Sequence, residues 1–179
     1  GPNVVVIPEF KIADKSSKDS GLTLFTSTIR RGSPDYLDPK LNCHSKLHEV
    51  QALIQAIEAG ADEALMLDIN GFVSTCNSTN FFMIKNGTVI TSTDQYCMNG
   101  ITREKIIEIC KENKIPIIEK NFSLYDVYDS DECFVTGTFA GISPVISIDG
   151  RMIENKSNTK ISATLSSLYT KKINSYVKN

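Results

Sequence analysis

The sequence has 179 residues, of which 41% are hydrophobic, and a formal net charge of −2. This length and apolar content fit one domain of typical size with its own core. Basic residues are scattered, which excludes the charge pattern of a nucleic-acid-binding protein, and no stretch approaches the ~18 apolar residues of a membrane span. Five widely spaced cysteines without a CxxC pair favour a reducing compartment, so we expect a cytoplasmic protein.

Residues 1–20 differ in character from the rest of the chain. Gly1 and Pro2 resemble the remnant of a cleaved affinity tag, and residues 4–7 have the composition of a buried strand. The polar residues 11–21 predict a loop or linker. We therefore expect a tag remnant, a first strand and a linker within residues 1–20, and one domain over residues 21–179.

The first half of this domain carries clear strand and helix patterns. Apolar and polar residues alternate over 21–29, which predicts a strand, while residues 47–59 have a 3.6-residue period that stops at Gly60, as in an amphipathic helix. Residues 64–75 and 80–91 each contain two short apolar runs separated by an Asn-Gly turn. Two such segments in succession predict two β-hairpins and an antiparallel sheet.

The second half predicts a helix that opens with Thr102 as its N-cap and ends before Pro116. Further along the chain we expect a strand at 117–120, a helical turn at 124–128, strands at 133–136 and 145–148 with a turn at 149–150, and a closing helix at 162–177. A mixed sheet with flanking helices corresponds to an α/β or α+β fold.

Three polar clusters follow these elements, at residues 75–80, 99–102 and 136–138. They combine glycine with small hydroxyl residues, and one of them opens a helix. Such segments can form a phosphate cradle, because backbone N–H groups and the helix dipole both favour an anion. A capped helix or a polar turn explains each cluster taken alone.

Six segments stand out together by their order and spacing: residues 60–68, 70–73, 80–82, 100–103, 131–138, and 144–145 with 148–151. They closely resemble the signature of class IV (fold type IV) aminotransferases. That family includes branched-chain and D-amino-acid aminotransferases and aminodeoxychorismate lyase. The resemblance extends from about Arg30 to Arg151 and implies the larger, C-terminal domain of these enzymes, a mainly antiparallel pseudo-barrel flanked by helices.

The resemblance implies pyridoxal 5′-phosphate (PLP) as the cofactor and assigns residues to it. Ile101 and Thr102 would hold its phosphate at the start of a helix, and Gly137 with Thr138 would complete the cup from another turn. Backbone groups of Thr138 and Phe139 would face the carboxylate of the substrate.

The residues at the cofactor ring depart from the family pattern. Asn80 would lie under the pyridine ring, and Thr75 stands where the family has the carboxylate that keeps the ring nitrogen protonated. Asn42 aligns with the Schiff-base lysine of the motif Arg-Arg-x-x-x-Asp-x-x-Asp-Pro-x-x-Lys, and an amide cannot form an imine. A neutral hydroxyl at Thr75 would weaken the electron sink but still permit imine chemistry.

Lys46 is the candidate for the lysine that bonds to the cofactor. It lies four residues after Asn42, on the same face if a helix has already begun, and the family often has a cofactor-facing tyrosine at this position. Its flexible stem would reach the aldehyde carbon. Lys40 is the second candidate, and a solvated surface lysine is the alternative for Lys46.

The neighbouring histidines and cysteines have simpler interpretations. His44 and His48 flank Lys46 at a spacing of four residues and would serve as acid-base groups or metal ligands, or be an ordinary pair at a helix start. Without a third ligand nearby, we expect no metal. Cys43 and Cys76 are expected to be structural and buried.

The function expected in the full-length protein is transfer of an amino group between an amino acid and a 2-oxo acid, as in branched-chain or D-amino-acid aminotransferases. An aminodeoxychorismate-type lyase and a non-catalytic domain that keeps only the phosphate cup are the alternatives. The family has a smaller N-terminal domain that nothing before Val4 resembles, so we expect a C-terminal fragment, inactive alone. The complete enzyme is expected to be a homodimer.

Overall fold

The computed structural model describes residues 1–10, 20–35, 37–153 and 160–177. Nine strands lie in this part of the chain: β1 Leu22–Thr26, β2 Glu63–Leu67, β3 Val73–Cys76, β4 Asn80–Lys85, β5 Thr88–Thr91, β6 Ile117–Glu119, β7 Glu132–Gly137, β8 Gly141–Ile148 and β9 Arg151–Met152. The helices are α2 Leu47–Glu58, α3 Ile101–Glu112, α4 Leu124–Tyr128 and α5 Ile161–Val177. None of these helices is both long enough and apolar enough to cross a membrane.

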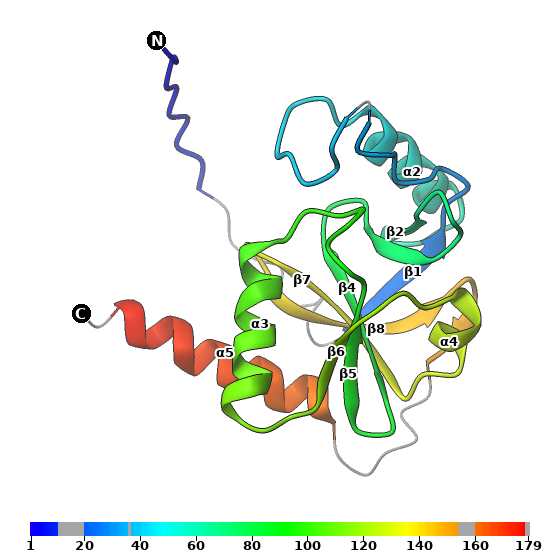
Figure 1. Cartoon of the computed structure of the whole chain (residues 1–179), viewed down its shortest axis with the longest axis vertical. Helices are drawn as coiled ribbons and strands as arrows, with labels where there is room; N and C mark the ends of the chain where they lie inside the picture. Colours follow the sequence, from blue (N-terminus) through cyan, green and yellow to red (C-terminus); the bar gives the residue numbers. More distant parts are fainter. Residues whose placement is uncertain (11–19, 36, 154–159, 178–179) are drawn as a thin grey trace.

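All nine strands belong to one sheet, in the order β3-β2-β1-β8-β7-β4-β5-β6, with β9 paired to β8. β1 runs parallel to β2 and β8, and β5 runs parallel to β6, whereas the other neighbours are antiparallel. The sheet curls into a half-barrel, with α3 and α5 beside each other and α2 at another end of the molecule (Figure 1). The expected mixed, mainly antiparallel sheet with flanking helices is confirmed.

Local sequence explains the turns and helix ends. Asn86 and Gly87 have φ values of 48° and 76°, as a two-residue hairpin turn of type I′ requires. Gly60, with φ of 76°, follows the C-cap of α2 in the left-handed conformation that ends many helices. The two hairpins and the helix predicted from these patterns are confirmed.

The two faces of the sheet carry separate apolar clusters. Alternate residues of β4 supply them, with Phe81 in one cluster and Phe82 in the other, because successive side chains of a strand point to opposite faces. Phe82 stacks on Phe134 of β7, with ring centroids 4.8 Å apart, within a cluster completed by α3 and α5. Burial on both faces accounts for the unbroken apolar run of β4.

α2 packs on the sheet through small side chains. Ala52 and Ala56 are fully buried against Ala64 and Met66 of β2. Alanine lets the helix approach the strand closely, and it leaves the larger apolar residues of α2 on the outer side of the helix.

Two sequence-based predictions are wrong. Residues 4–7 form no strand: their side chains are 78–85% exposed, and the segment extends away from the sheet, where no described strand pairs with it (Figure 1). Thr102 is not an N-cap, because Gly100 takes that position with φ −64° and ψ 143°, and Thr102 is buried inside α3. The predicted linker at 11–21 lies largely outside the described residues.

We expect Phe82→Ala to lower the free energy of unfolding by about 3–5 kcal/mol, because it removes a fully buried ring and leaves a cavity. Phe10→Ala is the matched control, since that side chain is 96% exposed, and its effect should stay within about 0.5 kcal/mol. Denaturant unfolding followed by circular dichroism measures both. Equal losses in the two variants would contradict this account of the core.

Candidate functional site

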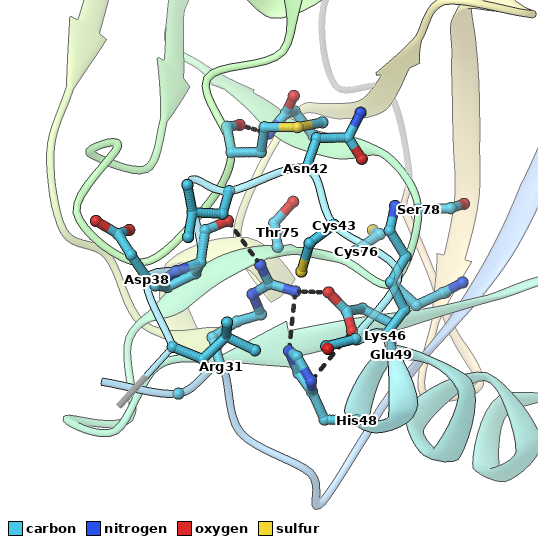
Figure 2. A pocket seen from close by; sticks show the side chains of 18 of the residues that line it. Arg31, Asp38, Asn42, Cys43, Lys46, His48, Glu49, Thr75, Cys76 and Ser78 are labelled. Carbon is cyan, nitrogen blue, oxygen red and sulfur yellow. Dashed lines mark hydrogen bonds and ion pairs between the residues drawn. The ribbon is translucent and has the colours of Figure 1, made fainter. Parts of the chain in front are cut away.

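An open cavity lies between the segment that leads into α2 and the turn joining β3 to β4 (Figure 2). The space between its walls is about 710 Å³, a figure that includes solvent-open space. Most of residues 37–49 line one wall, residues 75–80 line another, and Arg31 and Met98 contribute from two further segments. The cavity thus collects irregular segments around the end of β3 and the start of β4.

Three of the predicted site residues line this cavity. Lys46 is the N-cap of α2 and is exposed, and among the described residues that line the cavity it is the one lysine. Thr75 is buried, and its hydroxyl donates to the carbonyl oxygen of Thr79 at 2.7 Å. Asn80 is also buried, and its Nδ2 donates to the carbonyl oxygen of Met98 at 2.9 Å.

Asn42 lines the same cavity as Lys46, but the two residues do not share the face of a helix, as the sequence analysis had suggested. α2 begins at Leu47, so residues 42–46 are not helical and share no helical face. The segment reaches the cavity as an irregular strap instead. Lys46 therefore lines the cavity as the last residue of this irregular segment and not as part of a helix.

The predicted phosphate residues gather beside the cavity, around Asn80. Gly100, just before Ile101 and Thr102, lies so close that a Cβ there would stand 2.4 Å from Asn80 Oδ1. A Cβ at Gly137 would stand 3.3 Å from Thr79 Cγ2. The start of α3 and the end of β7 therefore converge on one turn.

The remaining predicted residues lie at the outer edge of this group. Thr138 and Phe139 occupy the exposed turn between β7 and β8, where the Phe139 side chain is 58% exposed. The Ile101 side chain is 70% exposed, whereas Thr102 is buried. None of these four residues lines the cavity itself. The residues predicted to bind phosphate therefore lie next to the cavity and not inside it.

Arg31 organises the cavity wall, a role that the sequence did not reveal. Its buried guanidinium donates to the carbonyl oxygens of Tyr96 and Pro39, both at 3.2 Å, and to Glu49 Oε1 at 2.7 Å. These contacts tie three segments together, and Figure 2 shows the one that joins Arg31 to Glu49. The only available signal was the Arg30-Arg31 pair, followed by an acidic residue in the first turn of a helix.

His48 lies beside the ion pair of Arg31 and Glu49. Its Nδ1 lies 3.1 Å from Glu49 Oε2, and its Nε2 lies 3.5 Å from Arg31 Nη1. Burial lowers the pKa of His48, Glu49 opposes this shift, and Arg31 adds to it. The neutral imidazole is therefore favoured in the folded protein.

The two cysteines at the cavity differ in exposure. Cys76 is buried, and this burial raises the pKa of its thiol well above the usual range. Cys43 is half-buried in the strap. The expected structural burial holds fully for Cys76 and in part for Cys43.

This combination of a curled mixed sheet, a glycine-opened helix and a polar turn beside one cavity defines a fold type IV domain. Residues 2–148 match the family model described as amino-transferase class IV. The chain belongs to this family.

Relatives with known names agree with that family. The chain is 37% identical over 171 residues to branched-chain-amino-acid aminotransferase-like protein 2 of Arabidopsis thaliana, and the match covers 96% of this chain and 30% of the relative. It is 41% identical over 148 residues to a putative branched-chain-amino-acid aminotransferase of Methanocaldococcus jannaschii, covering 82% and 51%.

Solved structures show the same fold. The branched-chain aminotransferase of Thermoproteus uzoniensis with norvaline superposes with a TM-score of 0.79 at 29% identity, covering 84% of this chain and 50% of that one. The Escherichia coli branched-chain amino acid aminotransferase gives 0.83 at 26%, covering 90% and 54%. This chain thus spans about half the length of these proteins, and 30% of the Arabidopsis relative.

We expect Arg31→Met to destabilise the protein by about 3–5 kcal/mol, because it leaves Glu49 and two carbonyl groups near the cavity without their partner. Arg30→Met is the matched control, since Arg30 is exposed and donates only one described bond, to the Ser27 carbonyl oxygen. Thermal and denaturant unfolding measure the difference. A similar loss in both variants would refute the bridging role of Arg31.

Acidification should weaken the folded state through His48. Because burial lowers its pKa in the folded protein, the unfolded chain binds this proton more readily, and the stabilisation present above the unfolded pKa of about 6.5 is lost as pH falls through the folded pKa. Unfolding free energies measured from about pH 7.5 to about pH 5 should fall less steeply for His48→Gln than for the wild type. Parallel pH profiles would show that His48 does not contribute.

Proposed function

We propose that residues 21–179 form the PLP-binding domain of an enzyme that transfers an amino group between an amino acid and a 2-oxo acid. The observation that carries this proposal is the convergence of the α3 start and the β7 end on the Thr79–Asn80 turn, beside a cavity that contains Lys46. Membership of the class IV family, whose aminotransferases use PLP, supports it. Relatives named as branched-chain aminotransferases favour substrates of that class.

The residues around Asn80 fit a phosphate group. α3 has no side-chain cap, so its first amides remain available to an anion, which the positive end of the helix dipole attracts. The start of α3 lies so close to Asn80 that a side chain at position 100 would not fit, and glycine occupies this position. On the paired strand, the buried hydroxyl of Thr136 has no hydrogen-bond partner in the described structure, which marks an unsatisfied polar position opposite Asn80.

PLP, when bound, supplies an aldehyde that condenses with amines and a ring that withdraws electrons from the substrate. In this proposal the chain supplies the amine from Lys46, because Asn42 in the same cavity carries an amide. Backbone groups of Thr138 and Phe139 would bind the substrate carboxylate. Ile101, Thr102 and Gly137 would hold the phosphate with Thr138.

Thr75 favours a second candidate function. Its hydroxyl is neutral and already donates to Thr79, so it cannot replace a carboxylate at the ring nitrogen. The departures at Thr75 and at the position of the lysine count against a standard transaminase, and a lyase of the aminodeoxychorismate type is the second candidate. The two are separated in the full-length enzyme by products: a transferase forms a new amino acid for each 2-oxo acid released, whereas a lyase forms product without an amino acceptor.

The test of Lys46 is covalent labelling. We expect treatment with PLP and then borohydride to modify this chain at Lys46, because this amine lines the cavity beside the residues predicted to bind phosphate. Peptide mass spectrometry locates the modified lysine. Lys46→Met should abolish the label at this site. Lys40→Met is the matched control, since Lys40 is exposed and does not line the cavity, and it should leave the label unchanged.

Other outcomes redirect the assignment. A label on Lys40 instead would move the role there. Binding of pyridoxamine 5′-phosphate, seen as a thermal shift, without any specific lysine label would support the non-catalytic domain that keeps only the phosphate cup.

A further inference from the structure

Glu63, at the start of β2, is a carboxylate that the proposed function leaves unused. It is half-buried, and no basic side chain among the described residues forms an ion pair with it. Its Oε2 accepts a hydrogen bond of 2.7 Å from the hydroxyl of Thr79, in the turn between β3 and β4. Thr79 lines the cavity and Glu63 does not, so the carboxylate supports the cavity wall from behind.

The surroundings of Glu63 disfavour its charged form. Burial raises the pKa of this carboxyl, hydrogen bonds from Thr79 and Ser78 oppose the shift in part, and the Asp62 carboxylate adds to it. The buried thiol of Cys76, on β3, is the other titratable group that interacts with Glu63. A charge kept where it weakens the folded state is typical of a group that has a task other than stability.

The carbonyl oxygen and the side chain of Thr79 are both held in place. The carbonyl accepts from the Thr75 hydroxyl at 2.7 Å and from the Cys76 amide at 2.8 Å. On the side chain, the hydroxyl donates to Glu63, and the methyl group faces Gly137, where a Cβ would stand 3.3 Å from Thr79 Cγ2. Because both groups branch from one Cβ, the bond to Glu63 also fixes the direction of the methyl group.

The rotamer of Thr79 decides which of its two groups meets the end of β7. In the structure that group is the methyl, which forms no hydrogen bonds. A rotation that brought the hydroxyl to Gly137 would let it bond to the backbone there, as threonine hydroxyls commonly do. The hydroxyl would then compete with an anion for the backbone N–H groups of this turn.

We propose that Glu63 is a positioning residue for phosphate binding, which holds the Thr79 hydroxyl away from Gly137 and so leaves the backbone at the end of β7 open to an anion. Glu63 acts through Thr79 and touches no ligand itself. The inference rests on the proposed function, in which Gly137 and Thr138 complete the phosphate cup.

The first test is the affinity of the chain for pyridoxamine 5′-phosphate, measured by isothermal titration calorimetry. Glu63→Ala should raise the dissociation constant about tenfold, because Thr79 loses its partner, and Glu63→Gln should raise it about threefold, because its amide oxygen still accepts. Asp62→Asn is the matched control. Asp62 is exposed and accepts from the Thr23 hydroxyl at 2.8 Å, so this variant should keep the wild-type affinity.

The second test separates positioning from a merely structural role. Because the pKa of Glu63 is raised in the folded protein, the wild type loses stability as pH rises through that folded pKa. At about pH 8, Glu63→Gln should therefore unfold at or above the wild-type temperature, although its affinity for pyridoxamine 5′-phosphate falls. A variant that loses stability and affinity together would assign Glu63 a structural role and overturn the proposal.

The third test needs no ligand. Nuclear magnetic resonance of methyl-labelled threonine reports the rotamer of Thr79, whose signal is identified by its loss in Thr79→Val. The wild type should populate one rotamer, and Glu63→Ala should average over several. A wild-type chain that binds no pyridoxamine 5′-phosphate would refute the proposed function, whereas unchanged affinity or a single Thr79 rotamer in Glu63→Ala would overturn the role of Glu63.

Discussion

The guanidinium of Arg31 is the contact on which the candidate site depends. It donates to the carbonyl oxygens of Pro39 and Tyr96 and to the carboxylate of Glu49. These bonds join the irregular segment before α2, the loop before α3 and the first turn of α2. A buried guanidinium without acceptors is strongly unfavourable, so these segments must close around it for the fold to be stable. The cavity wall is therefore set by one ion-pair cluster and not by regular structure.

The sheet contributes the fixed side of the same site. Asn80 of β4 pairs with Thr136 of β7, which brings the turn before β4 and the turn after β7 together. A one-residue slip in this register would send the Asn80 side chain to the opposite face of the sheet. The apolar residues of β4, which fix the register by packing in the core, therefore also fix the position of Asn80. Packing on both sheet faces thus positions polar groups that take no part in the packing.

The features that could be predicted from the sequence are those that depend on local patterns. The Asn-Gly hairpins and the period of α2 were recognised because each depends on a few adjacent residues. The strand at residues 4–7 was wrong, because a strand also needs a neighbour, and the role of Arg31 was missed because its partners lie in irregular segments far along the chain. Nothing in the period of α2 showed that its alanines, and not its larger residues, face the sheet.

α2 connects the cavity with the outer surface of the molecule. Lys46 lines the cavity at its N-terminus, Glu49 in its first turn binds Arg31, and Leu47 between them is 70% exposed. The burial of its alanines on β2 and the ion pair of Glu49 with Arg31 fix the position of α2, and so the point at which Lys46 meets the cavity. Since Lys46 meets the cavity at the helix start and Asn42 meets it from the irregular segment, the position of Lys46 depends on the placement of α2 itself.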